Sequence, residues 1–388
     1  MTTDTAPGGP AAAGTEPAID MDAVLAEIRR RRLEFEVLRH VPQDVVRKLQ
    51  QIGCYRAFVP REFGGDELSP ADFCRLLERI AVADASTAWV ASFGVSSVYL
   101  AGLPPERFAE IYGNDPDTVF AGALFPPQPA RTNGDVLTVS GRWNYCSGVT
   151  GASLVGVGVK VEGWDDGGLP RMAVLPRGRV TVDENWDTIG LVATGSHDVV
   201  LEDAEIPRDW TFVRGGKSRR EGTIFRYPSM AIAAQVLAVV GLGTAREALD
   251  VLAEMAGGDG SITGAPLLAK RAYVQAELAR GEAALAGARG FFYDTIEDAW
   301  QTLLAGDELS QQQRIRLRLG ATSAAHAGAE VARAAYVAGG TRSIVRHHPL
   351  GRAMNDAAAV AQHAFLGLGT WESAGGALLN QPGVPGYP

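Results

Sequence analysis

The chain offers few side chains that could carry acid–base chemistry. His363 lies seven residues after Asp356, a spacing that places both residues on one face of a helix, about two turns apart. An imidazole has an unperturbed pKa of about 6.5 and can donate or accept a proton near neutrality. A histidine at such a position can equally be a satisfied core residue. We interpret His363 as the acid–base candidate and Asp356 as a structural ion pair or cap.

Hydroxyl side chains form a second group of candidates. Ser147 stands near the end of the segment GRWNYCSG at residues 141–148. Thr194 and Ser196 lie in the segment DTIGLVATGSHDV at residues 187–199. A serine before a glycine is usually a turn residue. These hydroxyls therefore need a structural context before they count as binding groups.

Other motifs are explained without chemistry. The run GLGTAR at 241–246 half-matches a dinucleotide fingerprint but lacks the preceding strand and the final glycine. We interpret it as small residues at a helix–helix contact. His347 and His348 are sequence neighbours, do not share a helix face, and have no carboxylate or cysteine at ligand spacing, so no metal site is expected. The sequence has no P-loop and no Gly-x-Ser-x-Gly elbow.

Composition narrows the class of protein. Of 388 residues, 46% are hydrophobic and 21% are charged, as in ordinary globular proteins. The net charge of −9 argues against binding to nucleic acid or an anionic membrane. The three cysteines are far apart, which favours a reducing compartment without a disulfide framework. No apolar run reaches the roughly 20 residues of a membrane span, and the start lacks a signal-peptide pattern. We expect a cytoplasmic protein.

The pattern of apolar residues changes twice along the chain and predicts the elements that must position these side chains. Residues 1–18 form an expected disordered tail, and residues 19–117 show helical periodicity. Residues 118–225 alternate like short antiparallel strands. Residues 226–380 contain long Ala- and Leu-rich helices at 230–255, 266–303 and 310–338, typical of a four-helix bundle, before a short tail at 381–388. This order predicts an α+β fold and argues against a doubly wound sheet.

Four stretches together resemble the acyl-CoA dehydrogenase superfamily, and within it the group D flavin-dependent monooxygenases. That group includes dibenzothiophene monooxygenase and the oxygenase components of 4-hydroxyphenylacetate hydroxylase. The matching stretches are VPREFGG at 59–65, DASTAWV at 84–90, AGALFP at 121–126 with GRWNYCSG at 141–148, and the segment at 187–199. The resemblance extends over about residues 42–371. It implies an acyl-CoA dehydrogenase-like fold in a homotetramer.

The segment near the end of the chain separates two branches of the superfamily. Dehydrogenases carry a carboxylate base in this region, in several subfamilies within a "Y-E-G" segment. Here the sequence reads RAMND at 352–356 and QHAF at 362–365, which resembles the hydroxylase pattern ending in histidine. The resemblance therefore implies a catalytic role for His363 beside a flavin.

The resemblance also implies roles for other residues. A hydroxyl at Ser147 would lie near flavin N5, as the second catalytic residue. The implied cofactor-binding residues are Ala123, Leu124, Tyr145, Ser147, Thr194, Ser196, Gly340 and Arg342, the last two through a flavin phosphate across a subunit interface. The implied substrate pocket consists of Trp89, Phe93, Ser96, Phe125 and His363.

The function that the resemblance implies is the oxygenase component of a two-component monooxygenase. It would take reduced FAD or FMN from a separate flavin reductase and hydroxylate an electron-rich aromatic or indole-type molecule through a C4a-hydroperoxyflavin. Phenol-hydroxylating relatives often have a histidine where this chain has Ser96. That difference favours an indole, another electron-rich ring, a sulfur centre or an amino-sugar nitrogen. The alternatives are an amino-sugar N-oxygenase, an acyl-CoA dehydrogenase-type desaturase, for which we find no carboxylate base, and a non-catalytic scaffold.

Overall fold

The computed structural model describes residues 19–258 and 266–381. The tail expected at 1–18 and nearly all of the tail expected at 381–388 lie outside these residues. Within the described residues, no helix combines the length and the apolar character needed to cross a membrane.

The first part of the chain is helical, as predicted. Its helices are α1 Met21–Leu38, α2 Gln43–Gln51, α3 Pro70–Ala83, α4 Ala85–Ala91, α5 Ser96–Leu100 and α6 Pro105–Asn114, with a 3-10 turn, η2, at Ser92–Val95. Asp84 separates α3 from α4 because its extended backbone ends one helix and its carboxylate caps the next. The carboxylate accepts a hydrogen bond of 2.7 Å from the backbone N–H of Thr87. This cap fixes where the helix that carries Trp89 begins.

The middle of the chain forms one seven-stranded sheet in the order β5-β6-β2-β1-β3-β4-β7. The strands are β1 Phe120–Thr132, β2 Val136–Cys146, β3 Leu154–Val161, β4 Arg171–Pro176, β5 Thr181–Asp183, β6 His197–Pro207 and β7 Thr211–Val213. The sheet is mostly antiparallel, as predicted, except that β1 and β3 run parallel. The β1–β2 hairpin returns the chain to the start of β1, so β3 begins beside Phe120, on the other side of β1 from β2, and follows β1 in the same direction.

The last part of the chain is a helical bundle. Its helices are α7 Thr223–Arg226, α8 Ser229–Gly257, α9 Ala272–Leu304, α10 Gln311–Gly339, α11 Pro349–Gln362 and α12 Gly369–Leu378. The helix expected from residue 266 begins only at Ala272, after a 3-10 turn at Leu268–Lys270. The interpretation of the run at 241–246 is confirmed: a Cβ on Gly328 of α10 would lie 2.5 Å from the carbonyl oxygen of Gly241 in α8.

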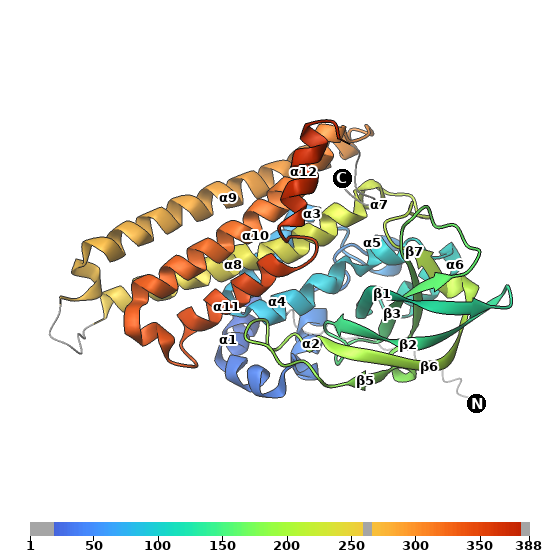
Figure 1. Cartoon of the computed structure of the whole chain (residues 1–388), viewed down its shortest axis with the longest axis horizontal. Coiled ribbons are helices and arrows are strands. Elements are labelled where there is room, and N and C mark those ends of the chain that lie inside the picture. The colour runs from blue at the N-terminus through green and yellow to red at the C-terminus, as the bar shows by residue number, and fades with distance from the viewer. Residues whose placement is uncertain (1–18, 259–265, 382–388) are drawn as a thin grey trace, which may run out of the picture.

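Three apolar cores hold these parts together, and one of them joins α6 to the sheet through Phe108 and Phe212. The N-terminal helices and the bundle share one continuous core, which includes Phe73 and Leu242. The sheet has its own core around Trp143, whose indole N–H donates to the carbonyl oxygen of Gly158. Figure 1 shows the long bundle helices side by side, the sheet at the opposite end of the molecule, and α4 and α5 between them. The ends of α4, β2 and α11 therefore approach one another where these layers meet.

Candidate active site

A bulge in β1 brings main-chain groups to the edge of the site. The β1–β3 ladder is regular at Ala123↔Val157 and resumes at Gln128↔Val159, so residues 124–127 leave the ladder opposite Gly158 alone. Glycine is required at 158, because a Cβ there would lie 1.9 Å from the Leu124 carbonyl oxygen. The side chain of Phe125 is 59% exposed as a result. Ala123 stays within the ladder, whereas the backbone of Leu124 and Phe125 steps out of it.

Tyr145 marks the end of β2 with an unusual backbone. Its φ of 62° lies in the left-handed region, which a non-glycine residue adopts at a cost of about 1–3 kcal/mol. The next turn closes when the N–H of Ser147 donates to the Tyr145 carbonyl oxygen at 2.9 Å. The Tyr145 ring is 70% exposed and lies edge-on to Trp186, with 6.0 Å between ring centroids. This geometry directs the ring outward and the Ser147 hydroxyl toward the neighbouring loop.

Three hydroxyls meet at this point and form a chain. The Oγ atoms of Ser147 and Ser196 are 2.6 Å apart, and Ser196 Oγ is 2.6 Å from Thr194 Oγ1. Thr194 donates its single proton to the Leu191 carbonyl oxygen at 2.9 Å. Ser196 must therefore donate to Thr194, and Ser147 must donate to Ser196. Ser147 Oγ is left with a free acceptor position and no free proton.

The loop that carries two of these hydroxyls is held by two helices. Most of the segment 187–199 has no regular secondary structure, because a strand begins only at His197. Asp356 of α11 accepts a hydrogen bond of 2.6 Å from the Leu191 N–H, and Ser86 of α4 accepts one of 3.2 Å from the Ala193 N–H. Gly190 packs so closely on α11 that a Cβ would lie 2.3 Å from the Asn355 carbonyl oxygen. These contacts fix the positions of Thr194 and Ser196.

Asp356 therefore positions a loop, and within the described residues it forms neither an ion pair nor a helix cap. Its carboxyl group is buried, and burial raises its pKa to about 8 despite the hydrogen bond from Leu191. The protonated acid is thus the main form at neutral pH.

The sequence spacing predicts that His363 and Asp356 share one face of a helix. This prediction is wrong, because His363 lies just after the end of α11. The helix ends at Gln362, and the backbone of His363 is extended. Its Nδ1 accepts a hydrogen bond of 3.2 Å from the Phe365 N–H, which assigns the proton of the neutral ring to Nε2. Burial lowers the pKa of His363 to about 4. At neutral pH the residue is an uncharged hydrogen-bond donor.

The end of α4 and the turn η2 connect His363 with the hydroxyl chain. The imidazole lies edge-on to Trp89, with 5.4 Å between ring centroids. Gly148, next to Ser147, faces Phe93, because a Cβ on this glycine would lie 3.4 Å from the phenyl ring. Trp89 and Phe93 are one turn apart, so the two catalytic candidates lie against the same short helical segment. Ser96 is buried and donates its hydroxyl proton to the Phe93 carbonyl oxygen. It lines neither the cavity of about 630 Å³ beside this site nor a second cavity of about 340 Å³.

A cavity of about 630 Å³ opens beside this corner, within the size range of small-molecule sites. The bulge residues Leu124 and Phe125 line it, together with Met230 and Phe365. Phe365 also contacts the His363 ring, with 5.1 Å between centroids. Arg318 donates to the carbonyl oxygens of Met230, at 2.9 Å, and of Phe365, at 3.4 Å, and so ties the segment after His363 to α8. A hydrophobic ligand in this cavity would reach the neighbours of His363.

The sequence did not indicate Met230, Arg318 or Phe365. Each lies in or next to an ordinary helix, and the run RIRLRLG at 314–320 does not distinguish Arg318 from the two arginines before it. Gly340 and Arg342 lie in the 3-10 turn Gly340–Ile344 between α10 and α11, at the end of the bundle far from the sheet (Figure 1). Within one chain they do not meet the other candidates. Among the described residues, no group of three or more His, Cys, Asp or Glu side chains is arranged to hold a metal ion.

Comparison with known proteins relates both helical parts of the chain to one family. The model of the acyl-CoA dehydrogenase N-terminal domain matches residues 22–104, and that of the C-terminal domain matches residues 235–367. An indole-3-acetate monooxygenase from Pseudomonas putida is 52% identical over 94% of this chain and 95% of its own length. The flavin-dependent monooxygenase oxygenase subunit HsaA of Rhodococcus jostii is 28% identical over 89% of this chain and 93% of its own length.

A solved structure agrees over the same extent. The crystal structure of a 3-HSA hydroxylase from Rhodococcus superposes with a TM-score of 0.86 at 26% identity, covering 94% of this chain and 96% of that chain. The similarity therefore includes the sheet as well as the two helical parts.

Proposed function

The chain belongs to the acyl-CoA dehydrogenase-fold family of two-component flavin-dependent monooxygenases, and from that premise we propose that it hydroxylates indole-3-acetate or a closely related indole acid. It is an oxygenase component, and its cofactor is reduced flavin. The observation that carries the choice of substrate is the 52% identity with an indole-3-acetate monooxygenase over nearly the full length of both chains.

The residues of the site fit a flavin. A planar ring system needs flat apolar walls and hydrogen-bonding groups at its polar edge. The exposed ring of Tyr145 provides apolar surface, and the bulge leaves main-chain groups of Leu124 outside the ladder. Ser147, Thr194 and Ser196 add uncharged hydroxyls. We propose that these residues hold the cofactor.

The hydroxyl chain suits the reduced form of the cofactor. Reduced flavin carries a proton at N5, whereas N5 of oxidised flavin can only accept a hydrogen bond. Because Ser147 donates to Ser196, its Oγ offers an acceptor to such an N–H group. We propose that Ser147 binds this edge of the cofactor.

In the reaction, a substrate C–H bond becomes C–OH, the second oxygen atom of O2 leaves as water, and reduced flavin supplies the two electrons and two protons. The protein provides placement and exclusion of water. His363 offers a neutral Nε2–H that can donate to an oxygen atom without adding a charge. We propose that Trp89, which contacts His363, and Phe93, which lies beside Gly148, limit access of water to the site.

The direct test supplies the chain with FMN or FAD that has been reduced beforehand, then adds oxygenated buffer and indole-3-acetate. We expect a product that is heavier by one oxygen atom, and isotopically labelled O2 should supply that atom. An amino sugar and an acyl-CoA run in parallel represent the two other reactions. Oxygenation of the amino sugar alone, or reduction of oxidised flavin by the acyl-CoA, would contradict the proposal.

An oxygenase component requires a flavin reductase as its partner. We further propose a homotetramer in which Gly340 and Arg342 of one subunit reach the flavin phosphate of another. Exposed apolar side chains beside this turn, Val337, Ile344 and Val345, support an interface there. Sedimentation of the purified chain should give four times the mass of one chain, and a monomer would contradict the assignment of Gly340 and Arg342.

A further inference from the structure

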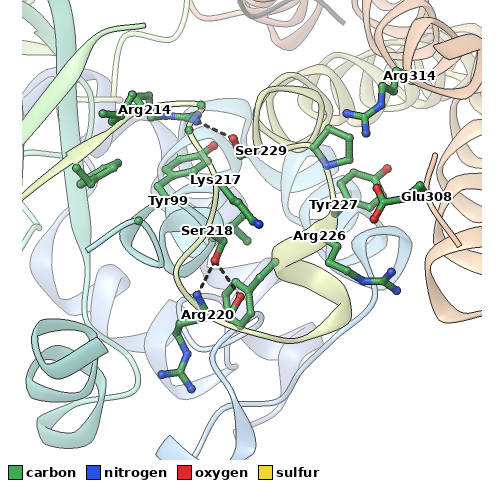
Figure 2. Close-up of a pocket in the computed structure, with 18 residues that line it drawn as sticks. Tyr99, Arg214, Lys217, Ser218, Arg220, Arg226, Tyr227, Ser229, Glu308 and Arg314 are labelled. Atoms are coloured by element: carbon green, nitrogen blue, oxygen red, sulfur yellow. Dashed lines mark hydrogen bonds between the residues drawn. The ribbon is translucent and has the colours of Figure 1, made fainter. Parts of the chain in front are cut away.

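Arg214 is a buried cation that no carboxylate in the described part of the chain neutralises. The residue follows β7 and is 5% exposed. Its guanidinium carbon lies 3.6 Å from the centroid of the Tyr99 ring, and Nη1 donates to Ser229 Oγ at 3.4 Å. Figure 2 shows the Arg214 side chain above Tyr99 with this bond to Ser229. Its partners are the ring and hydroxyl of Tyr99 and the hydroxyl of Ser229, all uncharged, and none of them is a charged acceptor for its five N–H donors.

Such an arrangement is costly, which points to a ligand. A buried charge is usually retained only with a partner or for a function. Burial also lowers the pKa of Arg214, although contact with Tyr99 acts in the opposite direction. A guanidinium remains charged under these conditions all the same. The missing partner is therefore an anion that comes from outside the chain.

The neighbouring cations differ from Arg214. A second cavity of about 340 Å³ is lined by Arg214, Lys217, Arg220, Arg226 and Arg314, among others (Figure 2). Arg220 forms an ion pair with Glu62, and Arg226 donates to the carbonyl oxygens of Leu303 and Gly306. Lys217 is exposed to solvent. Arg214 alone combines burial with a place in both cavities.

The larger cavity defines the rest of the ligand. Apart from Arg214, its walls include Phe125, Met230 and Phe365, which suit an aromatic ring. Two acids also line it, but Asp166 is paired with Arg171 at 2.5 Å and Asp165 is exposed. Arg318 and Lys160 line it too, but Arg318 donates to the carbonyl oxygens of Met230 and Phe365, and Lys160 is exposed. The guanidinium of Arg214 matches the single charge and planar shape of a carboxylate.

We propose that Arg214 binds the carboxylate of an arylacetate substrate whose ring occupies the larger cavity between Phe125 and Phe365. The proposal rests on the proposed function, and it makes Arg214 the residue that selects indole acids over neutral indoles. A phosphate group of the cofactor has the same kind of charge and is the competing occupant. The experiment separates the two.

The test compares Arg214→Met with wild type on indole-3-acetate and on its neutral analogue 3-methylindole. Met keeps an unbranched apolar side chain, although a shorter one, and removes the charge. Loss of a charged hydrogen bond should raise the Kd and KM for the acid by roughly tenfold to a hundredfold and leave those for 3-methylindole within about threefold. Lys217→Met is the matched control, because it removes the same charge from the smaller cavity only, and it should behave like wild type.

Several results would overturn the proposal. The first is that Arg214→Met weakens the binding of the acid and of the neutral analogue equally. The second is that the variant changes the binding of neither ligand. The third is that it weakens the binding of reduced flavin but not that of the acid. If Arg214→Met does not fold, the same affinities are measured for Arg214→Lys, and the affinities of wild type for the two ligands are compared directly. In that case, wild type must bind the acid at least about tenfold more tightly than the analogue.

The proposal and the proposed function fail in different ways. If wild type binds indole-3-acetate through Arg214 but forms no hydroxylated product, the binding site stands and the function falls. If Arg214→Met hydroxylates the acid as well as wild type does, the function stands and the binding site falls.

Discussion

Two non-glycine residues with left-handed backbone flank the hydroxyl chain. Tyr145 has a φ of 62° and Leu191 a φ of 51°. Leu191 is fixed on both sides, since its N–H binds Asp356 and its carbonyl oxygen accepts from Thr194 and Trp186. Strained residues of this kind persist only where surrounding contacts determine them, and they gather at functional sites. Here the strain lies where Ser147, Thr194 and Ser196 converge.

The hydroxyl chain leads to a prediction about the redox state of the bound cofactor. Replacing Ser147 with Ala removes an acceptor that only reduced flavin can use fully. We expect the Kd of reduced flavin to rise by roughly twofold to tenfold, and that of oxidised flavin to change less. Anaerobic titration of both forms measures the two values. Ser153→Ala is the control, since that hydroxyl donates to the Val119 carbonyl oxygen, and an equal effect on both flavin forms would contradict the assigned direction of the chain.

His363 leads to a prediction about pH. Its pKa is lowered from about 6.5 to about 4, so the folded state binds fewer protons than the unfolded state between these values. The contribution of His363 to stability therefore rises with pH through this window and is constant above it. His363→Gln should lose this dependence. Denaturant unfolding at about pH 4.5 and about pH 7.5 tests it, because wild type should lose more stability on acidification than the variant.

Other titrating groups cancel in that comparison. Burial also lowers the pKa of His197 and His348, and it raises the pKa of Asp356. All three residues are present in both proteins, so only the difference between the proteins reports on His363. Parallel curves of stability against pH would show that His363 has an ordinary pKa.

At the scale of elements, the site depends on a loop without regular structure. The segment before β6 is held by single hydrogen bonds that its backbone N–H groups donate to Ser86 of α4 and to Asp356 of α11. The carboxyl of Asp356 is mostly protonated at neutral pH because burial raises its pKa to about 8. An amide has the same shape as a protonated acid and the same acceptor oxygen.

Substitutions at Asp356 follow from this. Asp356→Asn should keep the bond to the Leu191 N–H and change stability little. Asp356→Ala leaves that buried N–H without a partner and should cost about 1–3 kcal/mol. Hydrogen exchange of the amides of residues 190–196, together with chemical unfolding, measures both effects. Faster exchange in the Asn variant, equal to that in the Ala variant, would mean that the charged carboxylate holds the loop.

At the scale of the whole molecule, the order of helices, sheet and bundle could be predicted from the sequence, because periodicities of 3.6 and 2 residues are local signals. Strand direction could not. The parallel pairing of β1 with β3 depends on where the hairpin returns the chain, and residue patterns do not encode that position. The start of α9 was predicted too early, because a proline at residue 266 fits the first turn of a helix as well as the loop before the 3-10 turn at Leu268–Lys270.

The site shows the same division. The hydroxyls and His363 could be proposed because they lie in short motifs that resemble those of the family and follow one another in the same order. Arg214, Arg318 and Phe365 could not, because their importance comes from burial and from contacts between segments distant in sequence. The direction of the hydroxyl chain also needed the Leu191 carbonyl oxygen in place.

The whole molecule must obtain its electrons from a separate source. The sequence has no NAD(P)H-binding motif, so this chain with NADH or NADPH and oxidised flavin should form no product. Reduced flavin reacts with O2 in solution, and the acceptor at Ser147 gives the protein a means to capture the reduced form first. A flavin reductase held behind a dialysis membrane should therefore suffice, since free flavin crosses the membrane. Product formation that requires both proteins on the same side would show that transfer depends on a protein–protein contact, and oxidation of NAD(P)H by this chain alone would contradict the two-component assignment.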